Sequence, residues 1–202
     1  MKVLPILRKR RTVRRFSDRG VSRDMVRTLI RAGCFAPSAH DLRPWRVVAI
    51  DDMKVKERLA DLSSAAYLRS LNSRKVGGAE EKAARARLRL IRAPVILVVC
   101  LDRSSLRQED SYRRKRNEWI MATQSVSAMV QNILLQASAM GLAGCWRGVA
   151  LFLGATLGAV LDLPPSFEPQ ALVEVGYPSE VPRKRMVQPV DVVLRFNTWA
   201  GE

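Results

Sequence analysis

The sequence has 202 residues, 48% of them hydrophobic, which is enough to bury a sizeable core in one domain without disulfides or metals. Its longest apolar run, residues 149–161, contains Gly154, Thr156 and Gly158 and is shorter than the roughly 18 apolar residues of a membrane-spanning helix. Near the N-terminus, residues 4–7 are too few to form the core of a signal peptide. We therefore expect a cytoplasmic protein.

The chain is strongly basic, with 35 Lys+Arg, 19 Asp+Glu and a formal net charge of +16. A charge of this size raises the hypothesis of a nucleic-acid-binding protein. Against that hypothesis, the basic residues occur along much of the chain, and no zinc-finger spacing, heptad zipper or aromatic ribonucleoprotein motif is present. A generally basic surface, or one suited to polyanionic small molecules, is the simpler account, and nucleic-acid binding is kept as the less favoured alternative.

The cysteine and histidine content argues against a fold held together by disulfides or by a bound metal. Cys34, Cys100 and Cys145 are odd in number and far apart, and the chain has a single histidine. Neither a disulfide framework nor a zinc-ligand spacing results. We expect all three cysteines to be buried as small hydrophobic residues.

In the first half of the chain, Ser22 is a plausible N-cap for a helix that runs to about Gly33 with one apolar stripe. Two prolines then interrupt regular structure within residues 36–44, and the valine-rich residues 45–50 predict a strand. Residues 54–71 then predict a helix, residues 73–80 predict a polar mobile loop, and residues 83–92 predict a charged helix.

In the second half, residues 93–101 are apolar on both faces and predict the central strand of a sheet. Residues 119–140 predict a long helix whose wide apolar stripe packs either in the core or against a second subunit. The glycine-rich residues 141–148 predict a turn. A helix over 151–161 and strands over 170–176 and 190–196 complete the chain, and this irregular order favours the α+β class.

One stretch, Arg10 to Phe16, places four arginines around the hydroxyl of Thr12. Guanidinium groups bind phosphate oxygens in a bidentate manner, and a threonine hydroxyl adds a further donor. The stretch is therefore a candidate phosphate receptor. The alternative is that it forms only a solvated basic face.

The sequence carries no recognisable acid, base or nucleophile set. There is no Ser/His/Asp arrangement, paired-carboxylate pattern, Walker loop or GxGxxG after a strand. A chain with an anion site and glycine-rich turns but no such set suits a protein that positions a cofactor, and the cofactor then performs the chemistry.

Five sequence blocks extend this interpretation and together span nearly the whole chain. The blocks are Arg10-Arg11-Thr12-Val13-Arg14-Arg15-Phe16, Ala36-Pro37-Ser38-Ala39 with Pro44-Trp45, Gln131-Asn132-Ile133-Leu134-Leu135, Gly141-Leu142-Ala143-Gly144-Cys145-Trp146, and Glu168-Pro169 running on to Gly176-Tyr177-Pro178. In these blocks and their order the chain resembles the FMN-dependent nitroreductase family. Each block is weak by itself, whereas five in order are specific.

The resemblance implies a single FMN-binding domain over residues 1–202, with a central mixed β-sheet flanked by helices. It also implies an intertwined homodimer with one FMN at each end of the interface. The implied activity is ping-pong transfer of two electrons, as a hydride, through flavin N5. NAD(P)H is the expected donor, and a nitroaromatic, a quinone or a flavin-like molecule is the expected acceptor.

The same resemblance implies the residues that would bind FMN. Those that would hold its phosphate and ribityl chain are Arg10, Arg11, Thr12 and Arg14, together with the C-terminal pair Arg183 and Arg185. Those that would contact the ring are Pro37, Ser38 and Ala39, from the second subunit, and Gly144 on a turn covering the other side. No catalytic side chain and no metal ligand is implied.

The loop before Trp45 departs from the common family pattern Gly-Asn-x-Gln-Pro-Trp. Asp41 stands where an asparagine usually contacts the flavin, and Arg43 stands where a glutamine is usual. The resulting His-x-x-Arg-Pro arrangement is similar to one branch, the flavin-binding domain of the enzyme that completes the deazaflavin coenzyme of archaea and actinobacteria. This branch implies FMN-dependent reduction of the coenzyme's dehydro precursor, with His40, Arg43 and Arg147 as substrate contacts. The alternative for the two arginines is an ordinary surface position.

Overall fold

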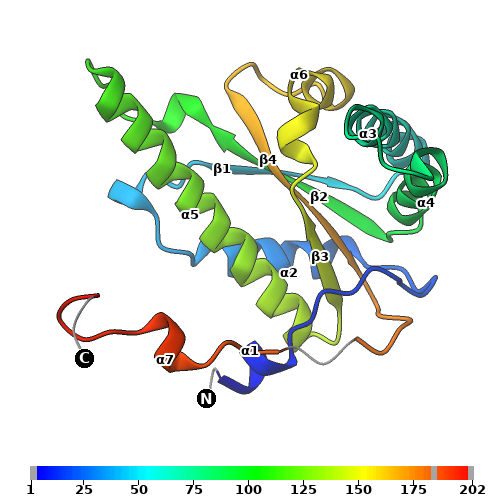
Figure 1. The fold of residues 1–202 in the computed structure, drawn as a ribbon, viewed down its shortest axis with the longest axis horizontal. Coiled ribbons are helices and arrows are strands. Elements are labelled where there is room, and N and C mark those ends of the chain that lie inside the picture. The colour runs from blue at the N-terminus through cyan, green and yellow to red at the C-terminus, as the bar shows by residue number, and fades with distance from the viewer. Residues whose placement is uncertain (1–3, 183–185, 200–202) are drawn as a thin grey trace.

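The computed structural model describes residues 4–182 and 186–199. At its centre lies a four-stranded sheet with the order β1-β2-β4-β3 (Figure 1). The strands are β1 (Trp45–Ile50), β2 (Val95–Asp102), β3 (Ala143–Arg147) and β4 (Phe167–Gly176). All three strand pairs are antiparallel. The parallel component expected of a mixed sheet is supplied, within the described residues, by one bridge between Thr12 and Gly144 on β3.

β2 is the centre of the fold, as its apolar sequence predicts. Every residue of this strand is buried, because helices cover both faces of the sheet. On one face, α2 (Arg23–Cys34) and α5 (Tyr112–Ala139) pack against Leu97 and Val99. On the other, α3 (Met53–Ser73), α4 (Ala79–Ile91) and α6 (Ala150–Leu161) pack against Ile96 and Val98. The expected α+β architecture is confirmed.

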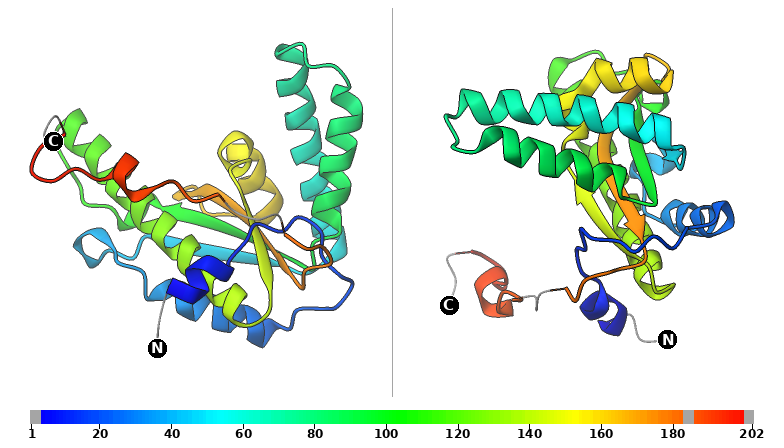
Figure 2. Two further views of the ribbon diagram at one scale, coloured as in Figure 1. Left: turned by 60° about the horizontal axis from the view of Figure 1, so that its bottom comes forward. Right: turned by 90° about the vertical axis from the view of Figure 1, so that its right-hand side faces the viewer.

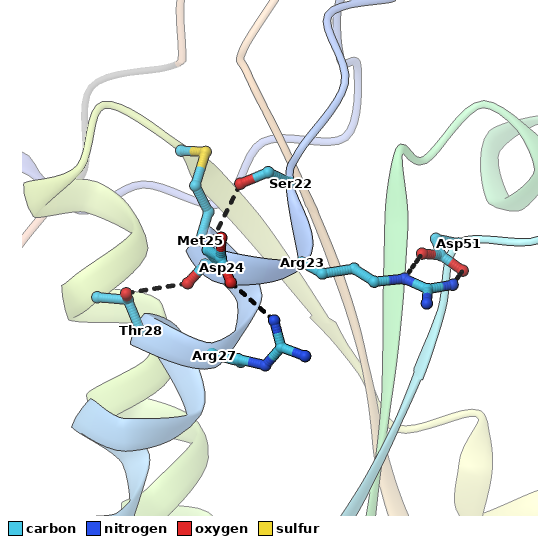
Figure 3. Close-up of polar contacts among 7 residues, drawn as sticks. All are labelled: Ser22, Arg23, Asp24, Met25, Arg27, Thr28 and Asp51. Carbon is cyan, nitrogen blue, oxygen red and sulfur yellow. Dashed lines mark hydrogen bonds and ion pairs between the residues drawn. The ribbon is translucent and has the colours of Figure 1, made fainter.

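The start of α2 is stabilised as the sequence predicts. The Ser22 hydroxyl accepts a hydrogen bond from the Met25 amide at 3.2 Å (Figure 3), which satisfies one of the free donors at a helix N-terminus. Arg23 forms a 2.8 Å ion pair with Asp51, just after β1, and this contact joins the helix to the sheet. α5 begins earlier than predicted because the Ser111 hydroxyl accepts from the Arg114 amide.

α3 and α4 form a hairpin that projects from the sheet (Figure 2). Asp52 caps the start of α3 by accepting from the Val55 amide at 3.0 Å. The loop predicted over residues 73–80 is shorter than expected, because Ser73 still belongs to α3 and α4 begins at Ala79. The short elements are α1 (Leu4–Lys9), the 3-10 turns η1 (Ala39–Asp41) and η2 (Arg103–Ser105), and α7 (Val190–Val193).

Three sequence-based expectations are wrong. Residues 190–196 contain the helix α7 rather than a strand, and every residue of this stretch is exposed. The glycine-rich residues 141–148 contain β3, which pairs with β4, and not only a turn. Cys34 is exposed at the end of α2, although Cys100 and Cys145 are buried as expected. Burial raises the pKa of the Cys100 thiol to about 12.

Over residues 4–182 and 186–199, no helix is both long and apolar enough to cross a membrane.

Candidate functional site

The segment from Arg10 to Phe16 runs along the edge of the sheet. Val13 is 1% exposed, and its amide donates to the Gly144 carbonyl on β3 at 3.2 Å. Because successive side chains of an extended segment point to opposite sides, burial of Val13 turns Thr12 and Arg14 toward solvent. Burial of Val13 therefore exposes the polar side chains of the Arg10 to Phe16 stretch on the side facing solvent.

These polar residues line a cavity of about 770 Å³, here called the arginine cavity. Its lining residues come from the N-terminal segment, from α4 and from the chain after β4; they are Arg10, Arg11, Thr12, Arg14, Arg15, Arg89, Glu180, Val181 and Pro182. Five of them are arginines, and the lining includes one carboxylate, Glu180. That carboxylate accepts from the Arg14 amide at 2.8 Å and lies 4.0 Å from Arg15. The cavity is strongly cationic and suits an anion.

The structure brings together four residues of the predicted phosphate site, namely Arg10, Arg11, Thr12 and Arg14. The other two, Arg183 and Arg185, lie outside the described residues. Sequence reasoning missed Arg89, which is one of several arginines on the charged helix α4. Nothing in its local sequence distinguishes it, because packing of α4 against the sheet is what brings it to the cavity.

Gly144 lies beside the arginine cavity, in a smaller cavity of about 210 Å³ that also includes Arg10, Arg11 and Val13. It is a buried strand residue and not the turn residue that the resemblance implies. A Cβ atom at this position would lie 2.6 Å from Cδ2 of Leu134 on α5. Gly144 thus permits close packing of α5 on β3 as well as the approach of the N-terminal segment.

A buried ion pair lies between β3 and β4. Glu174 is 0% exposed, and its Oε1 accepts from Nη1 of Arg147 at 2.8 Å. Its Oε2 has no hydrogen-bond partner among the residues that the structure describes. Burial raises the pKa of Glu174, and the positive charges of Arg147, Arg89 and Arg14 oppose that rise. Arg147, a predicted substrate contact, is therefore engaged by a buried carboxylate.

Arg147 also lines a second cavity, of about 710 Å³, between α3, α6 and the end of β3. We call it the hairpin cavity, after the hairpin formed by α3 and α4. Its lining residues are Ala66, Tyr67, Arg69, Ser70, Arg74, Arg147, Gly148, Val149 and Phe152. Among these residues, the sequence predicts a binding role only for Arg147.

The loop before β1 has an unusual backbone. His40, Asp41 and Arg43 have φ values of 52°, 55° and 48°, in the left-handed region that residues other than glycine adopt uncommonly. The loop is held by hydrogen bonds from the Arg43 amide to the Ser38 hydroxyl at 2.8 Å and from the Ala39 amide to the Ser125 hydroxyl at 3.1 Å.

The charged side chains of this loop pair with one another. Arg43 forms a 2.6 Å ion pair with Asp41, and this hydrogen-bonded contact lowers the pKa of Asp41. A predicted flavin contact and a predicted substrate contact thus neutralise each other. The His40 ring lies 3.9 Å from the carboxylate of Glu118 on α5, whose side chain is 5% exposed.

The two predicted halves of the site lie at opposite ends of the sheet. The loop leads into Trp45, which pairs with Leu101 near the end of β2 (Figure 1). The N-terminal segment bridges to Gly144, which pairs with Val175 of β4, and Val175 in turn pairs with Val95 at the start of β2. From Val95 to Asp102 the strand makes seven residue steps, or roughly 23 Å. Within one chain, Pro37, Ser38, Ala39 and His40 line neither the arginine cavity nor the smaller cavity at Gly144.

The sequence matches the model of the nitroreductase family over residues 7–177. A protein of Methanothermobacter thermautotrophicus with the provisional name NADH dehydrogenase/NAD(P)H nitroreductase is 28% identical over 187 residues, which cover 92% of this chain and 82% of that protein. The protein YfhC of Bacillus subtilis, provisionally named an NAD(P)H nitroreductase, is 25% identical over 185 residues, covering 92% and 89%.

Solved structures have the same fold. A protein of Desulfovibrio desulfuricans, provisionally named a nitroreductase and solved in complex with FMN, is 28% identical with a TM-score of 0.74, and 98% of each chain is covered. A BluB-like flavoprotein of Clostridium difficile has a TM-score of 0.78 at 22% identity, covering 98% of this chain and all of that one, and this likeness concerns the fold alone.

Proposed function

Since the chain belongs to the nitroreductase family, we propose that it is an FMN-dependent oxidoreductase that uses NAD(P)H to reduce a small organic acceptor. The observation that carries the proposal is the arginine cavity, which gathers five arginines and Thr12 around one space. The FMN complex of the Desulfovibrio desulfuricans protein and the NAD(P)H named for the curated relatives support it.

The residues of the arginine cavity fit the phosphate of FMN. Arg10, Arg11, Arg14 and Arg89 would supply charged donors, and the Thr12 hydroxyl would supply a neutral one. The carboxylate of Glu180 does not oppose this fit strongly, because the Arg14 amide and the Arg15 side chain already engage it. When bound, FMN would supply the hydride chemistry that the chain's own side chains lack.

The spectrum of the purified protein tests this function. Protein reconstituted with FMN is expected to be yellow, to bleach when NADH or NADPH is added without oxygen, and to regain its colour when a nitroaromatic or a quinone follows. Free FMN with the same reductant serves as the control for uncatalysed reduction. A protein that takes up no flavin, or whose flavin stays oxidised with both nucleotides, would contradict the proposal.

We further propose that a second copy of the chain completes the site. The loop with Ser38 and His40 lies at the far end of the sheet from the arginine cavity of its own chain, so a dimer is the arrangement that would bring such a loop to the partner's cavity. Residues 186–199, here called the C-terminal arm, are all exposed and extend away from the sheet (Figure 2). Phe196 and Trp199 in this arm are 75% and 70% exposed. Apolar side chains so exposed mark a contact surface.

Light scattering tests the dimer. The protein is expected to have the mass of two chains, and the double variant Phe196→Ser/Trp199→Ser is expected to shift toward one chain and to hold less FMN. The matched control is Leu4→Ser/Leu7→Ser, which removes two exposed apolar side chains from α1 at the other terminus. A wild-type monomer that nevertheless holds one FMN per chain would refute the shared site.

Two sequence-based alternatives stay predictions. Reduction of a deazaflavin precursor rests on the loop His40 to Trp45, and binding of a deazaflavin coenzyme to the FMN-loaded protein would test it. Nucleic-acid binding rests on the net charge alone, and an affinity that falls steeply with salt would support it.

A further inference from the structure

The hairpin cavity combines aromatic rings with arginines that lack partners. Tyr67 from α3 and Phe152 from α6 line it, and Phe152 is 82% exposed. Two arginines also line the cavity, Arg69 near the end of α3 and Arg74 just after that helix. Neither makes a side-chain hydrogen bond or an ion pair within residues 4–182 and 186–199. The exposed aromatic rings can bury apolar surface of a ligand, and the unpaired guanidinium groups beside them can bind an anion.

The lining of this cavity carries a net positive charge, and two of its arginines are not balanced by nearby acids in the described part of the chain. Its lining contains no carboxylate, and the third arginine, Arg147, is already balanced by buried Glu174. On the hairpin, Asp61 pairs with Arg87 and Glu81 pairs with Arg85, and neither Glu57 nor Glu80 lines the cavity. Arg69 and Arg74 are therefore the charges that an anion in this cavity would meet.

The size and walls of the cavity restrict the occupant. Its volume of about 710 Å³ lies within the range of about 300–1,000 Å³ that is typical of small-molecule sites. Ala66, Val149 and Phe152 provide an apolar wall, against which a flat ring buries surface, whereas the arginines favour a carboxylate or phosphate at its edge. An apolar protein segment would cover the apolar wall but would leave both guanidinium groups without an anionic partner.

Position links this cavity to the arginine cavity. Gly144 and Arg147 are three residue steps apart on β3, or roughly 10 Å. Glu174, which holds Arg147 at the hairpin cavity, also lies within electrostatic reach of Arg14 and Arg89 of the arginine cavity. Gly144 itself lines the smaller cavity beside the arginine cavity, so the direct link between the two larger cavities is Glu174, which pairs with Arg147 of one and lies near the arginines of the other.

We propose that the hairpin cavity binds the electron acceptor, and that this acceptor is a planar aromatic molecule with a carboxylate or phosphate group, recognised by Arg69 and Arg74. The role as acceptor site rests on the function proposed above, whereas binding of the aromatic anion does not. Preference for an anion over its neutral isostere is the property that these two arginines would create.

Calorimetric titration with 4-nitrobenzoate and its neutral analogue 4-nitrobenzamide tests the proposal. Titrations are run on the FMN-saturated protein and on the protein as purified, both in a buffer without phosphate, because phosphate would compete for Arg69 and Arg74 as well as for the arginine cavity. The pocket variant is Arg69→Gln/Arg74→Gln. The matched control is Arg31→Gln/Arg58→Gln, which removes two exposed arginines of α2 and α3 outside both cavities.

The wild-type protein and the control are expected to bind the benzoate about three- to tenfold more tightly than the benzamide, and the pocket variant is expected to lose this preference. Phe152→Ala is expected to weaken both ligands by a similar factor, about two- to tenfold. Equal wild-type affinities, or an equal loss in the control and the pocket variant, would overturn the proposal. An anion preference in protein that takes up no FMN would uphold the binding site and reject the flavoenzyme function.

Discussion

Substitution of Arg147 by alanine is expected to lower the free energy of unfolding by about 3–5 kcal/mol at neutral pH. Arg147 holds a charge-assisted hydrogen bond to Glu174, which is 0% exposed, and Oε2 of that carboxylate has no other partner among the described residues. Removing the guanidinium leaves a buried charge without its counterion, which is the costly way to break a buried pair. Urea unfolding at several pH values measures the change.

The pH dependence identifies the cause. Burial already raises the pKa of Glu174 above its ordinary value of 4.5, and loss of Arg147 raises it further. A carboxyl group with a raised folded-state pKa contributes stability that is present below its ordinary pKa and is lost as the pH rises through the folded-state pKa. The Arg147→Ala variant is therefore expected to be closest to wild type in acid and to fall behind as the pH rises.

Two controls separate the buried charge from general damage. Arg147→Ala/Glu174→Leu removes both charges and is expected to recover much of the lost stability, because apolar side chains replace buried pairs well. Arg85→Ala breaks an exposed pair with Glu81 and is expected to cost only about 0.3–0.5 kcal/mol. A loss for Arg147→Ala that grows as the pH is lowered would be inconsistent with this account.

The double variant Arg10→Ala/Arg89→Ala is expected to weaken FMN binding by about a hundred- to ten-thousandfold. Each substitution removes a charged donor from the arginine cavity, and a hydrogen bond to a charged group contributes about 1.5–3 kcal/mol. Quenching of FMN fluorescence by the apoprotein measures the affinity. The variant is expected to stay folded, because both side chains line the cavity and neither belongs to the buried core.

The control variant Arg31→Ala/Arg58→Ala has the same net charge as the double variant but leaves the cavity intact. It is expected to bind FMN with an affinity near that of the wild type, since general surface charge contributes little when salt is present. If both variants weaken binding equally, net charge attracts the flavin, and the assignment of the cavity fails.

The sequence by itself determined the elements whose signals are local. The capping role of Ser22 follows from one hydroxyl at the start of an apolar period, and burial of β2 follows from a strand that is apolar on both faces. Thr12 and the arginines around it also lie together in the structure because they are neighbours in the sequence. Local chemistry of this kind does not depend on how distant segments pack.

Tertiary structure alone decided the features that join distant segments. Arg89 reaches the arginine cavity because α4 packs on the sheet. Arg147 meets Glu174 because β3 pairs with β4, whereas the sequence predicts only a glycine-rich turn and a separate strand there. The same strand carries Arg147, which lines the hairpin cavity, and Gly144, which lines the small cavity beside the arginine cavity. Such contacts depend on strand order and helix packing, which no local pattern of side chains specifies.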